Sequence, residues 1–180
     1  MTLAYALLGL LAAGPRSGYQ LAQIFQRSLA HTWSARHSQI YPTLAQLRDD
    51  GLIRQSESGP RNRKTYEITE AGLAEVRHWL RETEPERANR HEAMMRVFFL
   101  WLIEPEEAER YLRAEADYHR RQLAEFEQIL ASGSFVTPST PLALEWGLRY
   151  EAAIATWAES AAAEVAEDAR RKKRRRRRTA

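Results

Sequence analysis

The sequence predicts a mainly α-helical protein with one small β-hairpin. Through most of the chain, apolar residues recur at spacings of three and four, which is typical of amphipathic helices. Only residues 52–57 and 63–68 have β character, and the Ser-Gly-Pro-Arg-Asn turn between them indicates a hairpin. The polar segment 83–91 contains one proline and separates residues 1–82 from residues 92–169. We therefore expect two domains joined by a linker.

The first domain begins with two predicted helices. Residues 3–12 are apolar nearly all round, which implies burial on several sides. Gly14 and Pro15 end this helix, and Ser17 is placed to cap the next one. The second helix carries its inward apolar side chains at Leu21, Ile24, Phe25 and Leu29.

A third helix, within residues 37–53, combines an apolar stripe with a row of uncharged polar side chains. Ser38 is its predicted N-cap, and Gly51 supplies a left-handed stop. The stripe that would hold this helix to the core is Ile40, Leu44 and Leu47. The residues that point away from the stripe can all hydrogen-bond: Ser38, Gln39, Tyr41, Thr43 and Gln46. A helix that only needed solubility would carry Lys and Glu there, so this row indicates contact with a polar, patterned partner.

The hairpin and a fourth helix complete the first domain. Thr69 is placed to cap the fourth helix, whose expected inner face is Leu73, Val76, Trp79 and Leu80. Helix, helix, helix, hairpin, helix is the order of a winged helix-turn-helix domain. In such domains the third helix enters the major groove of DNA, and the hairpin lies along the flanking backbone. The polar row would then face the groove. The basic hairpin tip would contact phosphate through Arg61, Arg63 and Lys64.

The C-terminal region is predicted to be helical and to pair with a second copy of the chain. We expect helices over residues 92–103, 105–131 and 141–170. In the last helix a stripe close to a coiled-coil seam comprises Ala143, Gly147, Tyr150, Ile154, Trp157, Ala161 and Val165. Two long amphipathic helices and a short apolar one make a thin layer and not a closed core, so we expect a homodimer. The candidate dimerisation residues are Tyr150, Ile154, Trp157, Ala161 and Val165.

The composition gives catalysis little support. The chain has no cysteine, its five histidines show no metal-ligand spacing, and it has neither a Gly-rich phosphate loop nor a nucleophile elbow. We therefore expect no catalytic residues, no metal site and no cofactor. The longest apolar run, 97–103, is far shorter than the roughly 18 residues of a membrane helix. No basic residue precedes the apolar opening, so we expect no signal peptide, no membrane partner and a cytoplasmic location.

The net charge of +3 hides a strong asymmetry along the chain. Residues 170–178 are nine consecutive basic residues, and the remainder holds 18 basic against 24 acidic residues. Residues 1–82 have a net charge of +3, whereas residues 83–169 have a net charge of −9. The tail, residues 170–180, is expected to be disordered, because like charges repel one another and nothing in it can be buried. It could fold back onto the acidic region or raise the general affinity for DNA through counterion release.

Three stretches of the first 82 residues together resemble the PadR family of bacterial transcriptional regulators: "ALLGLL…GPRSGYQLAQIF", "HSQIYPTLAQLRDDGLI" and "RKTYEITEAGLAEVRHWL". The helical C-terminal region resembles the dimerisation segment of the larger members. The resemblance implies a homodimeric repressor that binds double-stranded DNA at an inverted-repeat operator and leaves it when a small, often aromatic or hydrophobic, effector binds. Matched by position, the family's DNA surface falls on Tyr19, Ser38, Gln39, Tyr41 and Pro42, and its basic wing on Arg61, Arg63 and Lys64. The Arg-rich tail departs from the family.

Several of these residues have a second interpretation. Tyr19 could pack beneath the second helix and not contact DNA. The apolar cluster Met94, Met95, Phe98, Phe99 and Trp101 could be core or dimer interface, although Met95, Phe99 and Trp33 are candidates for an effector pocket. The alternative function is a winged helix that binds protein and not DNA. Salt-sensitive binding to duplex DNA would separate the two functions.

Overall fold

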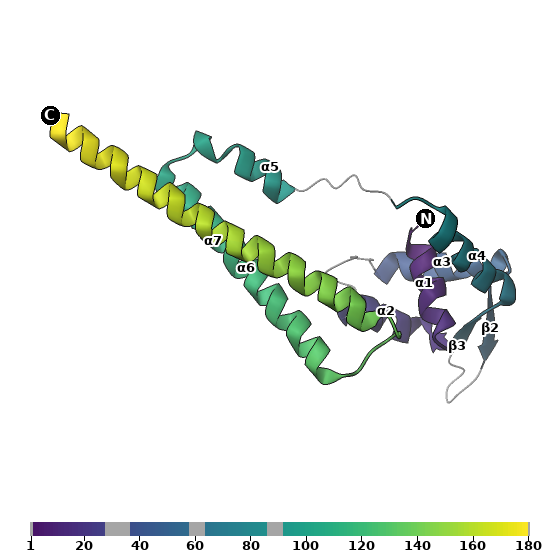
Figure 1. The fold of residues 1–180 in the computed structure, drawn as a ribbon. Coiled ribbons are helices and arrows are strands. Elements are labelled where there is room, and N and C mark those ends of the chain that lie inside the picture. Colours follow the sequence, from purple (N-terminus) through teal and green to yellow (C-terminus); the bar gives the residue numbers. More distant parts are fainter. Residues whose placement is uncertain (1, 28–36, 58–63, 86–91, 180) are drawn as a thin grey trace. The chain divides into compact units, whose positions relative to one another are not determined.

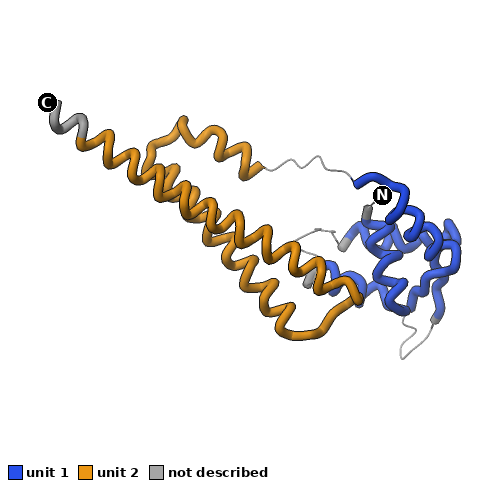
Figure 2. The backbone as a smooth tube through the Cα atoms, in the orientation of Figure 1, with its two compact units in different colours: residues 1–86 blue, residues 87–180 orange. Residues whose placement is uncertain are grey.

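The computed structural model describes residues 2–27, 37–57, 64–85 and 92–179. The chain forms two compact units, residues 1–86 and residues 87–180 (Figure 2). The junction between them falls inside the predicted linker, residues 83–91.

The first unit contains four helices and a small sheet in the predicted order (Figure 1). Its helices are α1 (Thr2–Ala12), α2 (Gly18–Arg27), α3 (His37–Asp49) and α4 (Glu70–Glu82). The hairpin consists of β2 (Ile53–Glu57) and β3 (Lys64–Ile68), and a further two-residue strand, β1 (Arg16–Ser17), pairs with β3 on its other side. All pairings are antiparallel, with Gln55 opposite Tyr66 and Ser17 opposite Thr65. This is the predicted winged helix-turn-helix architecture, with one strand that the sequence analysis did not expect.

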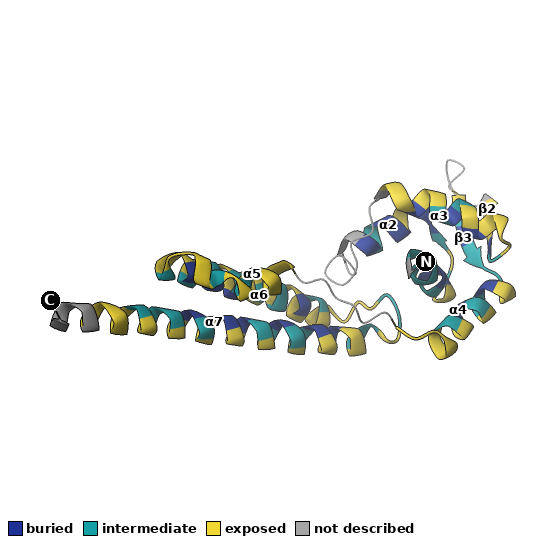
Figure 3. Ribbon diagram, turned by 90° about the horizontal axis from the view of Figure 1, so that it is seen from above, coloured by how far each residue is buried: buried dark blue, intermediate teal, exposed yellow. Residues whose placement is uncertain are grey.

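The core of the first unit is built around α1, which contacts α3, α4 and β3. Figure 3 shows the buried residues gathered on the sides of these helices that face one another. The helix α1 is buried on several sides as predicted, with Leu7, Leu8 and Leu11 at 2% exposure or less. At the edge of this core, the Trp79 ring of α4 stacks on Tyr5 with centroids 4.8 Å apart. Leu80, expected on the inner face of α4, is instead 69% exposed, because the helix turns Val76 and Trp79 inward.

The ends of α3 and α4 are fixed by capping. The Gly51 and Leu52 amides donate to the Arg48 and Leu47 carbonyls, and Gly51 has a φ of 72°, so α3 ends in a Schellman motif at the predicted glycine. The Thr69 hydroxyl accepts a hydrogen bond from the Gly72 amide at 3.1 Å, as expected of an N-cap. By contrast, α3 begins at His37, so Ser38 lies inside its first turn and is not the N-cap that the sequence predicted.

The second unit contains three helices and one short 3₁₀ turn. The predicted helix 92–103 is divided into α5 (Glu92–Phe98) and the turn η1 (Leu100–Leu102). The long helices α6 (Pro105–Ser132) and α7 (Thr140–Thr179) pack side by side (Figure 1). They approach closely at Gly147, where a Cβ atom would lie 2.7 Å from the Phe126 ring. Gly133, with a φ of 63°, ends α6 and starts the short connection to α7.

The side of α7 that packs on α6 differs from the predicted seam. Its buried residues are mostly small and, apart from Gly147, which the predicted stripe includes, they lie one position further along the helix: Leu144, Gly147, Glu151, Ala155, Ala158 and Ala162. Small side chains let the two helices approach, so the larger residues of the predicted stripe lie on the flank. Tyr150, Ile154, Ala161 and Val165 are half-buried, and Trp157 is 40% exposed.

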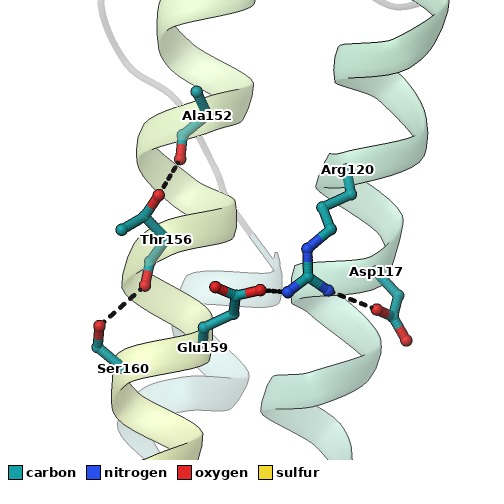
Figure 4. A network of polar contacts seen from close by, with 6 residues as sticks. All are labelled: Asp117, Arg120, Ala152, Thr156, Glu159 and Ser160. Carbon is teal, nitrogen blue, oxygen red and sulfur yellow. Dashed lines mark hydrogen bonds and ion pairs between the residues drawn. The ribbon is translucent and has the colours of Figure 1, made fainter.

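Polar contacts also join α6 to α7. His119 Nδ1 lies 2.5 Å from Glu151 Oε2, and both side chains are almost enclosed. The next residue of α6, Arg120, places its guanidinium between Glu159 of α7 and Asp117 of its own helix (Figure 4). In the same view, the Thr156 and Ser160 hydroxyls donate to carbonyls of α7 one turn earlier. Of these contacts, His119–Glu151 and Arg120–Glu159 join the two helices.

The basic tail is helical where the sequence analysis expected disorder. The helix α7 continues without a break to Thr179. Arg and Lys are good helix formers, and cations near a helix C-terminus interact favourably with the helix dipole. An ion pair of 3.1 Å between Arg171 and Glu167 supports the first turn of the basic run. The prediction of disorder considered charge repulsion alone and left out these local helix preferences.

Candidate DNA-binding surface

The helix α3 presents a polar face above a buried stripe, as the sequence predicted. Ile40, Leu44 and Leu47 are 1%, 0% and 3% exposed and anchor the helix in the core of the first unit. The opposite side carries the candidate groove residues. Ser38, Gln39, Tyr41, Pro42 and Gln46 are exposed, and Thr43 is half-buried. From Ser38 to Gln46, the outer side of α3 is therefore a row of uncharged groups above a buried apolar stripe.

Charge is distributed unevenly along α3. Its first turn contains no acidic residue, whereas its far end carries Arg48, Asp49 and Asp50. The N-terminal half therefore keeps the positive end of the helix dipole without a neutralising carboxylate. In helix-turn-helix proteins the N-terminal residues of the recognition helix contact the base edges. The uncharged half of α3 is the half that suits this contact.

Tyr41 is positioned by a glycine of α2. A Cβ atom at Gly18 would lie 2.7 Å from Cε1 of Tyr41, so the ring rests directly on the first residue of α2. Ser17 holds the start of α2 in place through two hydrogen bonds with Gln20. The Ser17 hydroxyl accepts from the Gln20 amide at 3.3 Å, and the Ser17 amide donates to the Gln20 side-chain oxygen at 2.8 Å. This capping box confirms Ser17 as the cap of α2. It also places the start of α2 against the middle of α3.

Tyr19 lies on the surface beside this contact. Its side chain is 60% exposed, and its hydroxyl accepts a hydrogen bond from Gln23 Nε2 at 3.0 Å. The alternative in which Tyr19 packs beneath α2 is therefore wrong. Tyr19 and the glycine under Tyr41 are consecutive residues, so both tyrosines belong to the same part of the surface.

Thr43 and Gln46 make local hydrogen bonds along α3. The Thr43 hydroxyl donates to the Gln39 carbonyl at 2.7 Å, and Gln46 Nε2 donates to Asp50 Oδ1 at 2.8 Å. Each side chain keeps further positions for a partner, because the Thr43 hydroxyl can still accept and Gln46 retains a second N–H and its carbonyl oxygen.

The wing is partly described. Lys64 opens β3 and is exposed, whereas Arg61 and Arg63 lie outside the described residues. The strand itself is anchored by the buried Tyr66, whose pKa is raised by burial. Arg54 of β2 is a further exposed cation on the wing, paired across the strands with Glu67 at 2.6 Å. A cation that already has a partner is less available to phosphate, so Lys64 is the better candidate among the described wing residues.

The second unit contains a mainly apolar hollow of about 910 Å³ between α5, η1 and the start of α6. Its lining is Glu92, Met95, Arg96, Phe99, Leu100, Ile103 and Tyr111. Two of the three candidate effector residues, Met95 and Phe99, are thus brought together, and the third, Trp33, lies outside the described residues.

Arg96 and Tyr111 are the polar groups of the hollow that the sequence analysis missed. Arg96 pairs with Glu92 at 2.6 Å, and the Tyr111 hydroxyl donates to the Ala93 carbonyl at 3.3 Å. Burial and the nearby Glu115 carboxylate raise the pKa of Tyr111, so its phenol stays a hydrogen-bond donor. A planar apolar molecule would find apolar walls there, and an anionic group on it would have to displace the Glu92 carboxylate, a third polar group of the lining, to reach the Arg96 guanidinium.

Large apolar side chains are exposed over much of the second unit. On α5 and η1, Phe98 and Trp101 are 75% and 76% exposed. On α7, Trp146 is 63% exposed and stacks on Tyr150 with centroids 5.6 Å apart. Apolar surface of this extent is typical of a face that another protein surface covers.

Among the described residues, no group of three or more His, Asp or Glu side chains is placed to hold a metal ion. Within the same part of the chain, none of the helices is long and apolar enough to cross a membrane.

Comparison with known proteins connects this geometry to a family. Residues 7–78 match the transcriptional regulator PadR-like family, and residues 89–166 match a second family described as virulence activator alpha C-term. The chain is 32% identical to the negative transcriptional regulator PadR of Bacillus subtilis, over 92% of this chain and 98% of that protein.

Two solved structures extend the likeness to the fold. The crystal structure of Bacillus subtilis PadR in complex with operator DNA is similar with a TM-score of 0.80 and 31% identity. The crystal structure of the same protein with p-coumaric acid is similar with a TM-score of 0.77 and 31% identity. Each comparison covers 92% of this chain and 99% of the other.

Proposed function

This chain belongs to the PadR-like family of transcriptional regulators, and we propose that it is a homodimeric repressor that binds an inverted-repeat operator. The observation that carries the proposal is the uncharged polar row of α3 above its buried stripe. Members of this family are regulators and not enzymes. Because the partner is chromosomal DNA, we place the protein in the cytoplasm.

We assign two kinds of DNA contact to the first domain, residues 1–82. Gln39 and Tyr41 would read base edges or the groove wall, with Ser38, Pro42, Thr43 and Gln46 beside them. Tyr19, Lys64, Arg61 and Arg63 would contact phosphate, which positions the domain without reading sequence. In a symmetric dimer the two α3 helices would meet half-sites about one helical turn, or 34–36 Å, apart.

Dimerisation is assigned to residues 92–169. The exposed aromatic residues of α5, η1 and α7 support this assignment, because one copy of the chain leaves them in water. The candidate stripe Tyr150, Ile154, Trp157, Ala161 and Val165 flanks the row that packs on α6, so a partner helix can reach it while the α6–α7 pair stays intact.

A small aromatic effector is proposed for the hollow between α5 and α6. Met95 and Phe99 would contact its ring, and Arg96 would meet an anionic group if the effector carries one. The relative that was solved with p-coumaric acid, a planar aromatic acid, supports this class of ligand. Release from the operator requires that the effector bind better to a form of the dimer in which the α3 helices no longer match the half-sites.

Selection from a library of random duplexes tests the proposed function. The full chain should enrich an inverted repeat, and adding it should lower transcription from a promoter that carries the repeat. If no sequence is enriched and binding to duplex DNA does not change with salt, the alternative of a protein-binding winged helix is favoured.

A further inference from the structure

The last part of α7 extends beyond the packing that holds the second unit together. The last fully buried residue of the helix is Ala162, and the described side chains from 170 to 174 are all exposed. The helix nevertheless continues to Thr179, drawn in yellow at the end of the chain in Figure 1. This extension also lies beyond both of the segments that match known families. Its role is therefore not explained by dimerisation or by the shared family sequence.

The extension has a charge density close to that of DNA. Residues 170–178 are seven arginines and two lysines in succession. A helix rises about 1.5 Å per residue, so this run carries one positive charge per 1.5 Å or so. Duplex DNA carries one negative charge per roughly 1.7 Å of its axis. Arginine adds geometric fit, because its guanidinium can bind phosphate through two parallel hydrogen bonds.

The described side chains of the basic run, residues 170–174, have few anionic partners within the second unit. Like charges one turn apart destabilise a helix. Among the ion pairs of the described residues, Arg171–Glu167 is the one that reaches into the basic run. The sequence left open a tail that folds back onto the acidic region, but a helix continuous with α7 leads away from α6 and cannot do so.

The composition of the run argues for DNA over a membrane. Helices that bind the membrane interface bury an apolar face among the lipids. Residues 170–178 contain no apolar residue, so they offer only charge and hydrogen bonds. The phosphate backbone of a duplex is satisfied by those two interactions alone.

We propose that residues 170–178 form a cationic helical arm that binds the phosphate backbone of duplex DNA without sequence preference. The proposal rests on the proposed function only in taking DNA as the partner. The arm adds to the contacts of α3 and the wing, and it anchors the protein on DNA while the operator is sought. A helix presents about half of its residues to a partner on one side, so about four or five of the nine cations would meet phosphate.

The test is the salt dependence of binding to random-sequence duplex by the full chain and by a chain that ends at Ala169. Each phosphate contact contributes about 0.9 to the slope of log affinity against log salt. Removing the arm should therefore lower the slope by about four per arm. Dimerisation and operator preference should be unchanged, because the buried row of α7 ends before the deletion.

A matched pair of variants distinguishes the effect of the arm on the salt slope from the effect of total charge. Each variant loses four cations from the second unit. The arm variant is R174Q/R175Q/R176Q/R177Q, and the control variant is R110Q/R113Q/R121Q/R149Q. The arm variant should lower the slope by about two per arm, or about four per dimer, because about half of the four cations face DNA. The control variant should keep the slope of the unmodified chain.

Three results would overturn the proposal. Equal slopes with and without residues 170–180 would show that the arm does not meet DNA. A loss near eight per arm, or about sixteen per dimer, would mean that nearly all nine cations of each arm reach phosphate, which a helix on one side of the duplex cannot arrange. Arm-dependent binding to vesicles of anionic lipid, with equal slopes on DNA, would assign the arm to a membrane. If the protein selects no operator but the difference in salt slope persists, the proposed function is wrong and the proposal for the arm still holds.

Discussion

Replacing Gly18 with alanine tests whether α2 positions the tyrosine that reads DNA. The new methyl group would lie 2.7 Å from Cε1 of Tyr41. Carbon atoms in contact prefer about 3.5–4.0 Å, so the ring must move by roughly 1 Å. A hydrogen bond or groove contact made by Tyr41 does not survive a displacement of that size.

The expected cost falls on operator binding and not on folding. A lost base or groove contact is worth about 1–3 kcal/mol, which corresponds to a loss of operator affinity of about 5- to 150-fold. The Tyr41 ring is 44% exposed and can swing into solvent, so the free energy of unfolding should change by less than about 0.5 kcal/mol. Fluorescence anisotropy on labelled operator and thermal unfolding would measure the two quantities.

Two further variants make this test decisive. Gly9→Ala is the matched control, because nothing lies within 4 Å of its Cβ position in α1, and it should leave DNA binding unchanged. If Gly18→Ala acts through Tyr41, the double variant Gly18→Ala/Tyr41→Ala should bind no more weakly than Tyr41→Ala alone. Fully additive losses would refute the argument that Gly18 serves to position Tyr41.

Four other predictions address the remaining assignments. Gln39→Ala should weaken operator binding by about 1–3 kcal/mol more than binding to random DNA, whereas Lys64→Ala should weaken both equally and lower the salt slope by about one. A change in sequence preference on Lys64→Ala would reverse these roles. Trp157→Asp should give folded monomers by sedimentation, because it places a charge in the proposed dimer seam; a persisting dimer would remove Trp157 from the interface. His119→Ala should lower the free energy of unfolding by about 1–3 kcal/mol, because Glu151 loses its partner between α6 and α7; denaturant unfolding with an unchanged midpoint would contradict this. If the hollow takes an aromatic acid, Arg96→Gln should weaken the binding of a planar aromatic carboxylate, measured by calorimetry, more than that of the corresponding neutral amide; equal losses would exclude pairing of Arg96 with the anionic group.

Most of the first unit could be predicted from local sequence signals. The spacing of Ile40, Leu44 and Leu47 identified the buried side of α3, and Gly51 and Thr69 marked helix ends that the structure confirms. Strand β1 could not be predicted in the same way. It is two residues long and owes its existence to pairing with β3, which is distant in sequence. Ser38 was predicted to be the N-cap of α3 from its position before the apolar stripe, but the helix begins one residue earlier, at His37.

The second unit shows where apolar periodicity is ambiguous. On α7 the larger residues Tyr150, Ile154 and Trp157 formed the more visible stripe in the sequence. The neighbouring row of Ala155, Ala158 and Ala162 packs on α6 instead, because small side chains permit close approach. Which row faces which partner depends on the shape of α6, and that information is not local. Helix propensity, which was available from the sequence, would have corrected the expectation of a disordered tail.

The candidate sites likewise divide into those visible as local sequence patterns and those that form only when the chain folds. The polar row of α3 was visible in the sequence, because uncharged residues at the exposed positions of one helix are a local pattern. The contact between Gly18 and Tyr41 joins two helices and could be found only in the folded chain. The same holds for Arg96 and Tyr111, which α5 and α6 bring to one hollow.

Nuclease protection of the DNA just upstream of this protein's own gene would test the central claim most directly. We expect two protected segments of inverted sequence whose centres lie about 10–10.5 base pairs, or a multiple of that, apart. Protection should weaken in parallel at both segments with Gln39→Ala. Uniform partial protection along the fragment, or a footprint that Gln39→Ala leaves unchanged, would contradict sequence reading by α3.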